Sequence, residues 1–308
     1  MNSRAYAIFL AFLAAVLYAV NIPVSKLLLV HVSPVFMASL LYFGAGFGMF
    51  AFSLTPSGRE SKDPPLTRRE LPYTLGMIVL DIAAPIFLML GLNSAASANV
   101  SLLNNFEIVA TSLIALLIFR ETISRTLWIS LGFITAASVL LSFDGAESLQ
   151  FSVGSLFVLA ACLCWGLENN CTRALSSKSA VQIVVIKGIF SGLGALIVAL
   201  LSGGTFPVLP YLVLALLLGF VSYGLSIYFY VRAQKYIGAA STSAYYSVSP
   251  FIGALLSFLI FDEALAKTYP AALIVMLIGA AFAVMDTLQI HPLHQIKKYL
   301  EIKQYDKE

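Results

Sequence analysis

The chain has 308 residues, of which 60% are hydrophobic and only 11% are charged, and its mean hydropathy is +0.92. Soluble domains carry about 25% charged residues, so this composition excludes an ordinary soluble protein and indicates a membrane protein. The net charge of +3 is too small to indicate nucleic-acid binding. The three cysteines, Cys162, Cys164 and Cys171, lie in one apolar segment without metal-site spacing. We interpret them as small buried hydrophobic residues and expect no metal or cofactor.

Ten apolar runs long enough to cross a bilayer follow one another along the chain. Their continuous apolar character favours helices over the alternating strands of a β-barrel. The first run continues past Asn21 without a small-residue cleavage site, so we interpret it as a transmembrane helix rather than a signal peptide. The predicted spans are 5–25, 34–54, 72–92, 95–119, 126–143, 152–171, 180–201, 210–230, 238–261 and 268–288.

The lysines and arginines predict the orientation of these spans. With the N-terminus inside, 15 of the 18 basic residues fall on the cytoplasmic side, including those of the polar loop 55–70 and of the tail. Cytoplasmic loops of membrane proteins are enriched in lysine and arginine. We therefore expect a plasma-membrane protein with both termini in the cytoplasm.

The two halves of the chain resemble each other. LYAVNIPVSK at 17–26 aligns with CWGLENNCTR at 164–173, and FRET at 119–122 aligns with FDEA at 261–264. Because each half has five predicted helices, the second half enters the membrane from the opposite side, which predicts an inverted repeat. The expected units are a first five-helix repeat at 1–147, a second at 148–288 and a cytoplasmic tail at 289–308.

These marks resemble those of the EamA-type members of the drug/metabolite transporter superfamily. The resemblance is carried by the ends of helices one and six, by Pro250, and by the glutamates after helices four and nine. It implies an all-α membrane protein of ten transmembrane helices, with a cavity between its halves. It also implies solute transport by alternating access, often coupled to protons or gradients. One departure is that Glu107 and Ile108 stand where helix nine has Ser249 and Pro250.

Glu107 is the leading candidate for a functional acid. A charged side chain near the centre of a transmembrane helix costs about 2.5–3.5 kcal/mol, so it needs a cavity or a partner. Ser101, Asn104, Glu107 and Thr111 form one polar stripe at helical spacing. We expect Glu107 to bind either a cationic group of the solute or a coupling proton. The alternative is a glutamate that only makes interhelical hydrogen bonds.

Five other charged residues need an interpretation. Asp81 and Lys187 lie within helices three and seven and are candidates for proton coupling or for a counter-ion, although Lys187 alternatively extends to the interface. Functional and structural roles are equally supported for Glu168. Glu121 and Glu263 occur at equivalent helix ends, where water is near, and we interpret both as structural.

Aromatic and polar residues complete the expected solute site. Helix nine has a hydroxyl-rich face that is suited to a polar solute, although such hydroxyls alternatively bond their own backbone. The predicted substrate-binding residues are Tyr18, Asn21, Asn104, Glu107, Trp165, Tyr245, Tyr246 and Ser249.

The leading functional hypothesis is a secondary transporter that exports a small polar metabolite, such as an amino acid or a related compound, with proton coupling as one option. The sequence has no GxxxxGK[ST] motif, so ATP is not expected to drive it directly. The alternative is a membrane-embedded enzyme acting on a lipid-linked substrate, but no HExxH or GxSxG motif supports it. The expected partners are the solute and the lipid bilayer, with a homodimer as a further option and no nucleic acid.

Overall fold

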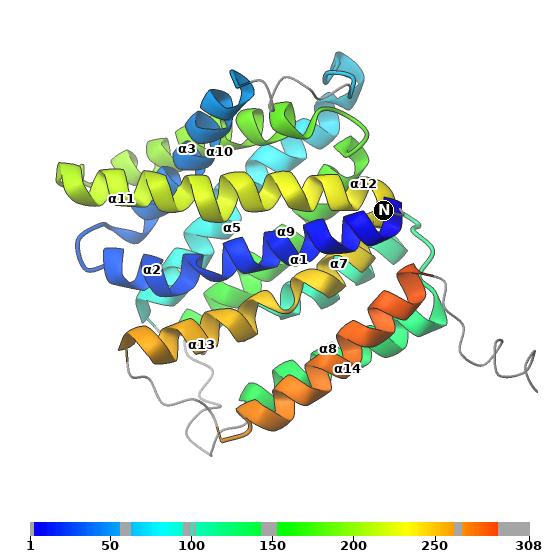
Figure 1. The fold of residues 1–308 in the computed structure, drawn as a ribbon. Coiled ribbons are helices and arrows are strands. Elements are labelled where there is room, and N and C mark those ends of the chain that lie inside the picture. The colour runs from blue at the N-terminus through cyan, green and yellow to red at the C-terminus, as the bar shows by residue number, and fades with distance from the viewer. Residues whose placement is uncertain are drawn as a thin grey trace, which may run out of the picture.

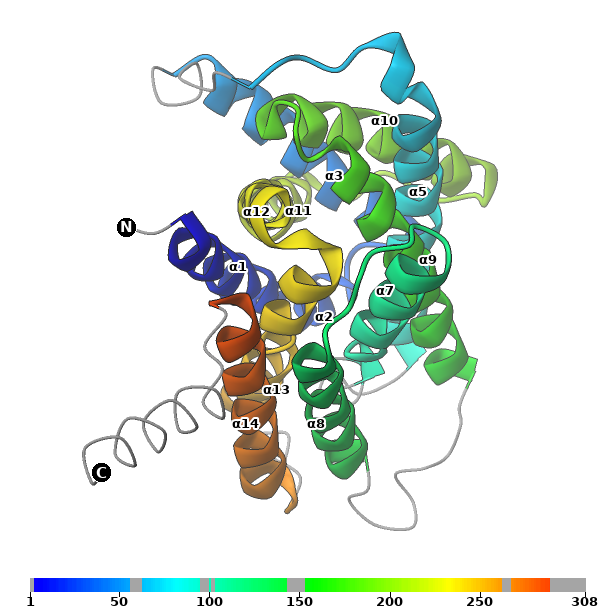
Figure 2. The ribbon, with the colours of Figure 1, turned by 90° about the vertical axis from the view of Figure 1, so that its right-hand side faces the viewer.

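The computed structural model describes residues 3–55, 63–94, 100, 103–142, 153–261 and 267–288, and these residues are helical without any strand. Figures 1 and 2 show the helices gathered into a bundle, with α8 and α14 side by side along one edge. The α-helices are α1 Ser3–Ala19, α2 Asn21–Leu28, α3 Pro34–Ser53, α5 Leu71–Ser94, α7 Phe106–Leu117, α8 Arg125–Ser142, α9 Val153–Leu175, α10 Ala180–Leu201, α11 Leu209–Gly219, α12 Ser226–Tyr246, α13 Ser249–Phe261 and α14 Tyr269–Thr287. A 3₁₀ helix, η1 (Arg68–Glu70), and a π-helix, η2 (Phe220–Leu225), complete the set.

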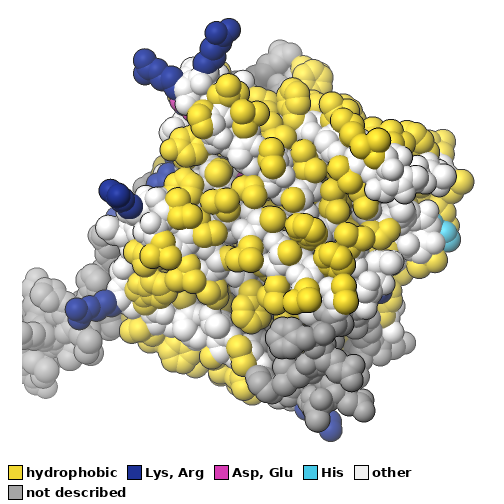
Figure 3. Space-filling model, turned by 180° about the vertical axis from the view of Figure 1, so that it is seen from behind, with side chains coloured by type: hydrophobic (Ala, Val, Ile, Leu, Met, Phe, Trp, Pro, Cys, Tyr) yellow, Lys and Arg dark blue, Asp and Glu magenta, His cyan; other side chains and the backbone are white. Residues whose placement is uncertain are grey.

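Seven helical segments among the described residues are long and apolar enough to cross a membrane. Hydrophobic side chains also cover most of the surface seen in Figure 3, with Lys and Arg near its edges. Phe47, Leu201 and Leu259 are examples of large apolar residues that are more than half exposed, which suits contact with lipid rather than water. The prediction of an all-α, multi-pass membrane protein is therefore confirmed. The seven segments are Ser3–Leu28, Pro34–Ser53, Arg68–Ser94, Val153–Leu175, Ala180–Leu201, Leu209–Phe261 and Tyr269–Thr287.

Several predicted spans are broken within the membrane segment. The helix of the first span is interrupted at Val20, and a turn at Asn104–Asn105 precedes α7. Gly238 has φ +79° and ψ 173°, which breaks α12 at a conformation that glycine adopts easily. A second turn, at Ser247–Val248, lies just before Pro250, which lacks a backbone hydrogen-bond donor. Pro85, by contrast, lies inside the continuous helix α5.

Close glycine contacts hold α3 against α10. A Cβ atom at Gly188 would collide with the backbone of Gly46 and of Tyr42. Ser39 Oγ of α3 donates a hydrogen bond of 2.9 Å to the carbonyl oxygen of Gly192 in α10. Apolar burial contributes little to helix association inside lipid, so such close packing and interhelical hydrogen bonds provide the attraction.

We therefore expect Gly188→Ala to destabilise the fold, because the added methyl group forces α3 and α10 apart. Overpacking of this kind costs about 1–3 kcal/mol, and a lower thermal unfolding midpoint in detergent would report it. Gly132→Ala is the matched control, because a Cβ atom there meets no neighbouring atom within 4 Å. Equal midpoints for the two variants would contradict the proposed contact.

Candidate functional site

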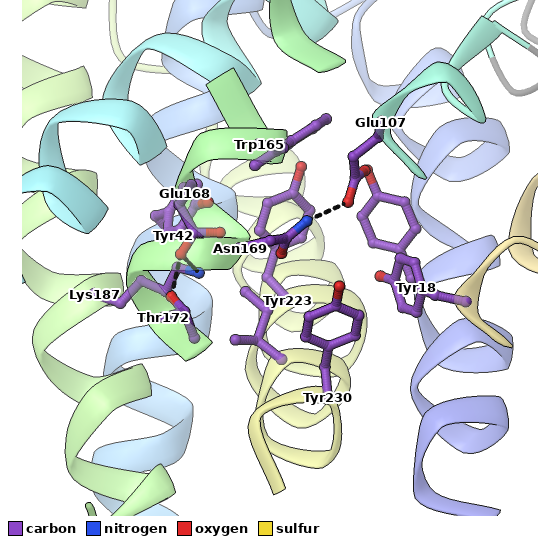
Figure 4. Close-up of a pocket in the computed structure, with 12 residues that line it drawn as sticks. Tyr18, Tyr42, Glu107, Trp165, Glu168, Asn169, Thr172, Lys187, Tyr223 and Tyr230 are labelled. Atoms are coloured by element: carbon purple, nitrogen blue, oxygen red, sulfur yellow. Dashed lines mark hydrogen bonds and ion pairs between the residues drawn. The ribbon is translucent and has the colours of Figure 1, made fainter. Parts of the chain in front are cut away.

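A narrow cavity lies inside the bundle, among α1, α3, α7, α9, α10, η2 and α12 (Figure 4). The centre of a water molecule can occupy about 40 Å³ of it. Because one water needs about 10–15 Å³ on this measure, the cavity has room for only a few waters. A larger solute therefore requires side chains or helices to move. The lining residues are Tyr18, Tyr42, Glu107, Trp165, Glu168, Asn169, Thr172, Lys187, Tyr223, Ile227, Tyr230 and Tyr246.

Lys187 forms ion pairs with two acids at this cavity. Its Nζ atom lies 3.1 Å from Asp81 Oδ2 and 2.7 Å from Glu168 Oε1, and all three side chains are almost completely buried. Tyr42 Oη donates a hydrogen bond of 2.6 Å to Asp81 Oδ1, and Thr172 Oγ1 donates one to Glu168 Oε1. A buried charge is tolerated only when it is paired and hydrogen-bonded. The Lys187 pairs therefore connect α5, α9 and α10. Removing any one of the three charged side chains would leave another one buried without its ionic partner.

Glu107 lies in the first turn of α7, directly after the turn at Asn104–Asn105. This position places the carboxyl group near the positive end of the helix dipole. Asn169 Nδ2 donates a hydrogen bond of 2.7 Å to Glu107 Oε1 and lies 3.2 Å from Thr111 Oγ1. Among the described residues, no lysine or arginine forms an ion pair with Glu107. Glu107 therefore differs from Asp81 and Glu168, which share an ammonium group.

Aromatic rings form much of the remaining wall. The ring centroid of Tyr18 lies 6.4 Å from that of Trp165, 5.8 Å from that of Tyr223 and 5.3 Å from that of Tyr246. Tyr223 comes from η2, and π-helical turns often occur at functional sites. The buried hydroxyls of Tyr18 and Tyr223 make no regular hydrogen bond among the described residues. These hydroxyls lie near each other and near the side chains of Asn104 and Asn21, and they can reorient toward a polar group that enters the cavity.

Comparisons with known proteins identify the family of this chain. The sequence model of the EamA-like transporter family matches residues 5–143 and 152–285. The chain belongs to the EamA-like transporter family. An "Uncharacterized transporter" from Methanothermobacter thermautotrophicus is 27% identical over 284 residues, which are 86% of this chain and 82% of the relative. The resemblance seen in the sequence is thereby confirmed, and the protein is a membrane transporter.

The fold also matches a solved structure that is named only "Crystal structure of protein". The TM-score is 0.74 at 18% identity, and the match covers 92% of the transporter and 98% of the solved chain. At this identity the likeness concerns the fold alone.

The structure brings part of the predicted site together. Tyr18, Glu107, Trp165, Lys187 and Tyr246 all line the cavity, and Asp81 contacts it through Lys187.

Four predicted substrate-binding residues are buried and are not among the lining residues, although Asn21 lies near the Tyr223 hydroxyl and Asn104 near that of Tyr18. Asn21 accepts a hydrogen bond from Ser25, and Asn104 lies against the Sγ atom of Cys162. Tyr245 donates to the carbonyl oxygen of Ala283 at 2.8 Å and contacts Phe12, on a different side of helix α12 from its neighbour Tyr246. The fourth residue, Ser249, is the buried first residue of α13.

Other lining residues were not predicted from the sequence. Asn169 could have been predicted from the sequence, because a side-chain amide inside an apolar segment needs a polar partner. Tyr42, Tyr223 and Tyr230 had little signal, because 12% of the chain is aromatic and any tyrosine in a helix can face lipid, core or cavity. The sequence around Thr172 likewise does not distinguish a hydroxyl that faces a cavity from one that donates a hydrogen bond to the backbone of its own helix.

Glu121 lies outside the cavity, at the end of the bundle. Arg120 adopts φ 55°, and Glu121 N donates a hydrogen bond of 2.8 Å to the carbonyl oxygen of Ala115, which closes the end of α7. The Glu121 carboxylate lies 4.0 Å from Arg173 Nε and also contacts Gly238. These contacts support a structural role. Glu263 and Ser101 lie outside the described residues.

We expect Lys187→Met to destabilise the transporter strongly, because it leaves Asp81 and Glu168 buried without their shared cation. Breaking a buried pair in this way costs about 3–5 kcal/mol, measured as a loss of folded yield and a lower unfolding midpoint. Lys235→Met is the control, because its pair with Asp63 is about one-third exposed and such surface pairs contribute about 0–1 kcal/mol. Adding Asp81→Asn and Glu168→Gln to Lys187→Met removes the unpaired charges and is expected to recover part of the stability. A Lys187→Met protein as stable as the Lys235→Met protein would contradict this account.

Proposed function

We propose that the protein is a secondary transporter that moves a small polar metabolite, an amino acid or a related compound, through the cavity at Glu107. The observation that supports this is a buried acid that has no ionic partner among the described residues and that faces a narrow cavity of aromatic and polar side chains inside a member of a transporter family. The small size of the cavity suits an occluded state, in which neither side of the membrane has free access. Alternating access then consists of opening it to one side at a time. Export as the direction, and a homodimer, stay predictions.

We also propose ten transmembrane helices, arranged as inverted repeats at 1–147 and 148–288 with both termini and the 289–308 tail in the cytoplasm. The helical segment Leu209–Phe261, which comprises α11, η2, α12 and α13, has 53 residues. At 1.5 Å per residue it would measure about 80 Å, whereas the hydrocarbon core of a bilayer is about 30 Å thick. The break at Gly238 is a suitable point for this segment to turn between two crossings. A plasma-membrane location rests on the positive-inside pattern of the sequence.

Cysteine labelling tests this topology. After replacement of Cys162, Cys164 and Cys171, single cysteines introduced at 55–70 and after residue 289 are expected to react with an impermeant reagent only from the cytoplasmic side. Cysteines at 144–151 and 202–209 are expected to react only from outside. Labelling of 55–70 from outside would overturn both the orientation and the inverted repeat.

Glu107 can serve the transport cycle in two ways. Its second carboxyl oxygen and the hydroxyls of Tyr18 and Tyr223 are available to a bound cationic group. Alternatively, the carboxyl group takes up and releases a proton as the cavity opens to each side. Asp81 and Lys187 lie at the same cavity and provide a second group through which a proton can couple to transport.

Exchange of Glu107 for glutamine tests its place in the pathway. In proteoliposomes supplied with an isotope-labelled metabolite extract, we expect Glu107→Gln to lower the transport rate about tenfold or more at equal folded protein, a loss of at least 1.4 kcal/mol of stabilisation. Glu121→Gln is the matched control: it is expected to lower folded yield while transport per folded molecule stays within about twofold. The opposite pattern would show that the functional acid is Glu121. Wild-type rate, affinity and pH dependence in folded Glu107→Gln would make Glu107 a packing residue.

A further inference from the structure

The charged groups at the cavity are unequal in number. Glu107, Glu168 and Asp81 bring three carboxyl groups, whereas Lys187 is the one base that lines the cavity among the described residues. Lys187 is shared by Asp81 and Glu168, so the direct partner of Glu107 is the neutral amide of Asn169. A bound positive charge beside Glu107 would provide the missing ionic partner.

The wall around Glu107 is suited to an organic cation. Figure 4 shows the Glu107 side chain directed toward Asn169, and Trp165 and Tyr18 line the same cavity. Tyr18 also contacts the rings of Tyr223 and Tyr246, so the aromatic surface is continuous. Aromatic faces attract ammonium groups and also pack against apolar carbon, which a hydrated inorganic ion does not offer.

We propose that the solute class of this transporter is small organic amines in their protonated form, rather than amino acids. The proposal rests on the transport function proposed above and narrows it. The ammonium group contacts Glu107, and the apolar or aromatic body contacts Trp165 and Tyr18. The α-carboxylate of an amino acid would add a fourth carboxyl group to the site. Lys187 is already held by two acids, so that carboxylate would meet like charges without a free cation.

Tryptophan fluorescence measures binding at this position directly. The chain has two tryptophans, and Trp128 is 39% exposed on α8, away from the cavity. Trp128→Phe therefore leaves Trp165 as the only tryptophan, whose emission is separable from that of the tyrosines by the excitation wavelength. The probes are phenethylamine, phenylalanine and 2-phenylethanol, which share a ring and a two-carbon chain but are cationic, zwitterionic and neutral. A protein with Trp165→Phe and intact Trp128 controls for partition of the probes into detergent.

The proposal predicts that phenethylamine changes Trp165 emission saturably, with a Kd about tenfold or more below that of either other probe. Adding Glu107→Gln is expected to weaken phenethylamine about tenfold or more, whereas Glu121→Gln changes its Kd less than about twofold. Equal affinities for the amine and the amino acid would overturn the proposal, as would amine binding that is unchanged in Glu107→Gln.

Counterflow into proteoliposomes separates the two proposals. Exchange of phenethylamine without exchange of phenylalanine supports the amine class. Exchange of phenylalanine without phenethylamine, or of labelled metabolites without any amine among them, overturns the amine class while the transport function stands. Glu107-dependent proton movement without binding of any probe also overturns it, because Glu107 then serves the proton alone. A protein that binds phenethylamine but moves none of the labelled compounds retains the amine site and loses the transport function.

Discussion

The contact of Lys187 with Asp81 and Glu168 is the interaction on which the arrangement around the cavity depends. Each of these side chains would be costly to bury alone, and more so in a bundle surrounded by lipid. Together they require α5, α9 and α10 to keep one relative position, and the hydrogen bond from Tyr42 extends the requirement to α3. The close glycine contacts between α3 and α10 are compatible with this arrangement, because the ion pairs and the Tyr42 hydrogen bond already hold the same helices together.

The opposite wall of the cavity has a different character. α7 and α12 carry Glu107, Tyr230 and Tyr246, and both helical stretches are interrupted close to the site, at Asn104–Asn105 and at Ser247–Val248. Interrupted helices absorb backbone changes over a few residues, as hinges do. The cavity therefore lies between a wall held by ion pairs and a wall built on helix breaks. A solute at the proposed site would contact both walls, because Glu107 belongs to α7 whereas Trp165 belongs to α9.

The sequence was a good guide to the helices and a partial guide to the site. The span predicted at 180–201 matches α10, and the span at 34–54 matches α3 to within one residue, because the length of an apolar run that crosses a bilayer is narrowly constrained. Asp81, Glu107 and Lys187 stood out because buried charge is rare in such runs. Which acid Lys187 pairs with depends on the rotation of each helix about its axis, which composition does not determine. For the same reason Tyr245 and Tyr246 were predicted together, although only Tyr246 lines the cavity.

The residues that differ between the two halves determine which groups are available to bind a solute, more than the residues that the halves share. Under the proposed repeat, Asp81 corresponds to Tyr223 and Glu107 to Ser249, so each of these two buried acids has a neutral counterpart in the second half. A strictly symmetric pair of halves would present the same groups from both sides, and a solute with one charged end would have two equivalent orientations. Here the single unshared carboxyl group of Glu107 and the aromatic surface that begins at Tyr18 distinguish the ends of a bound molecule. The proposed repeat would thus provide two halves that can exchange conformations, and the differences between them would give the solute one orientation during that exchange.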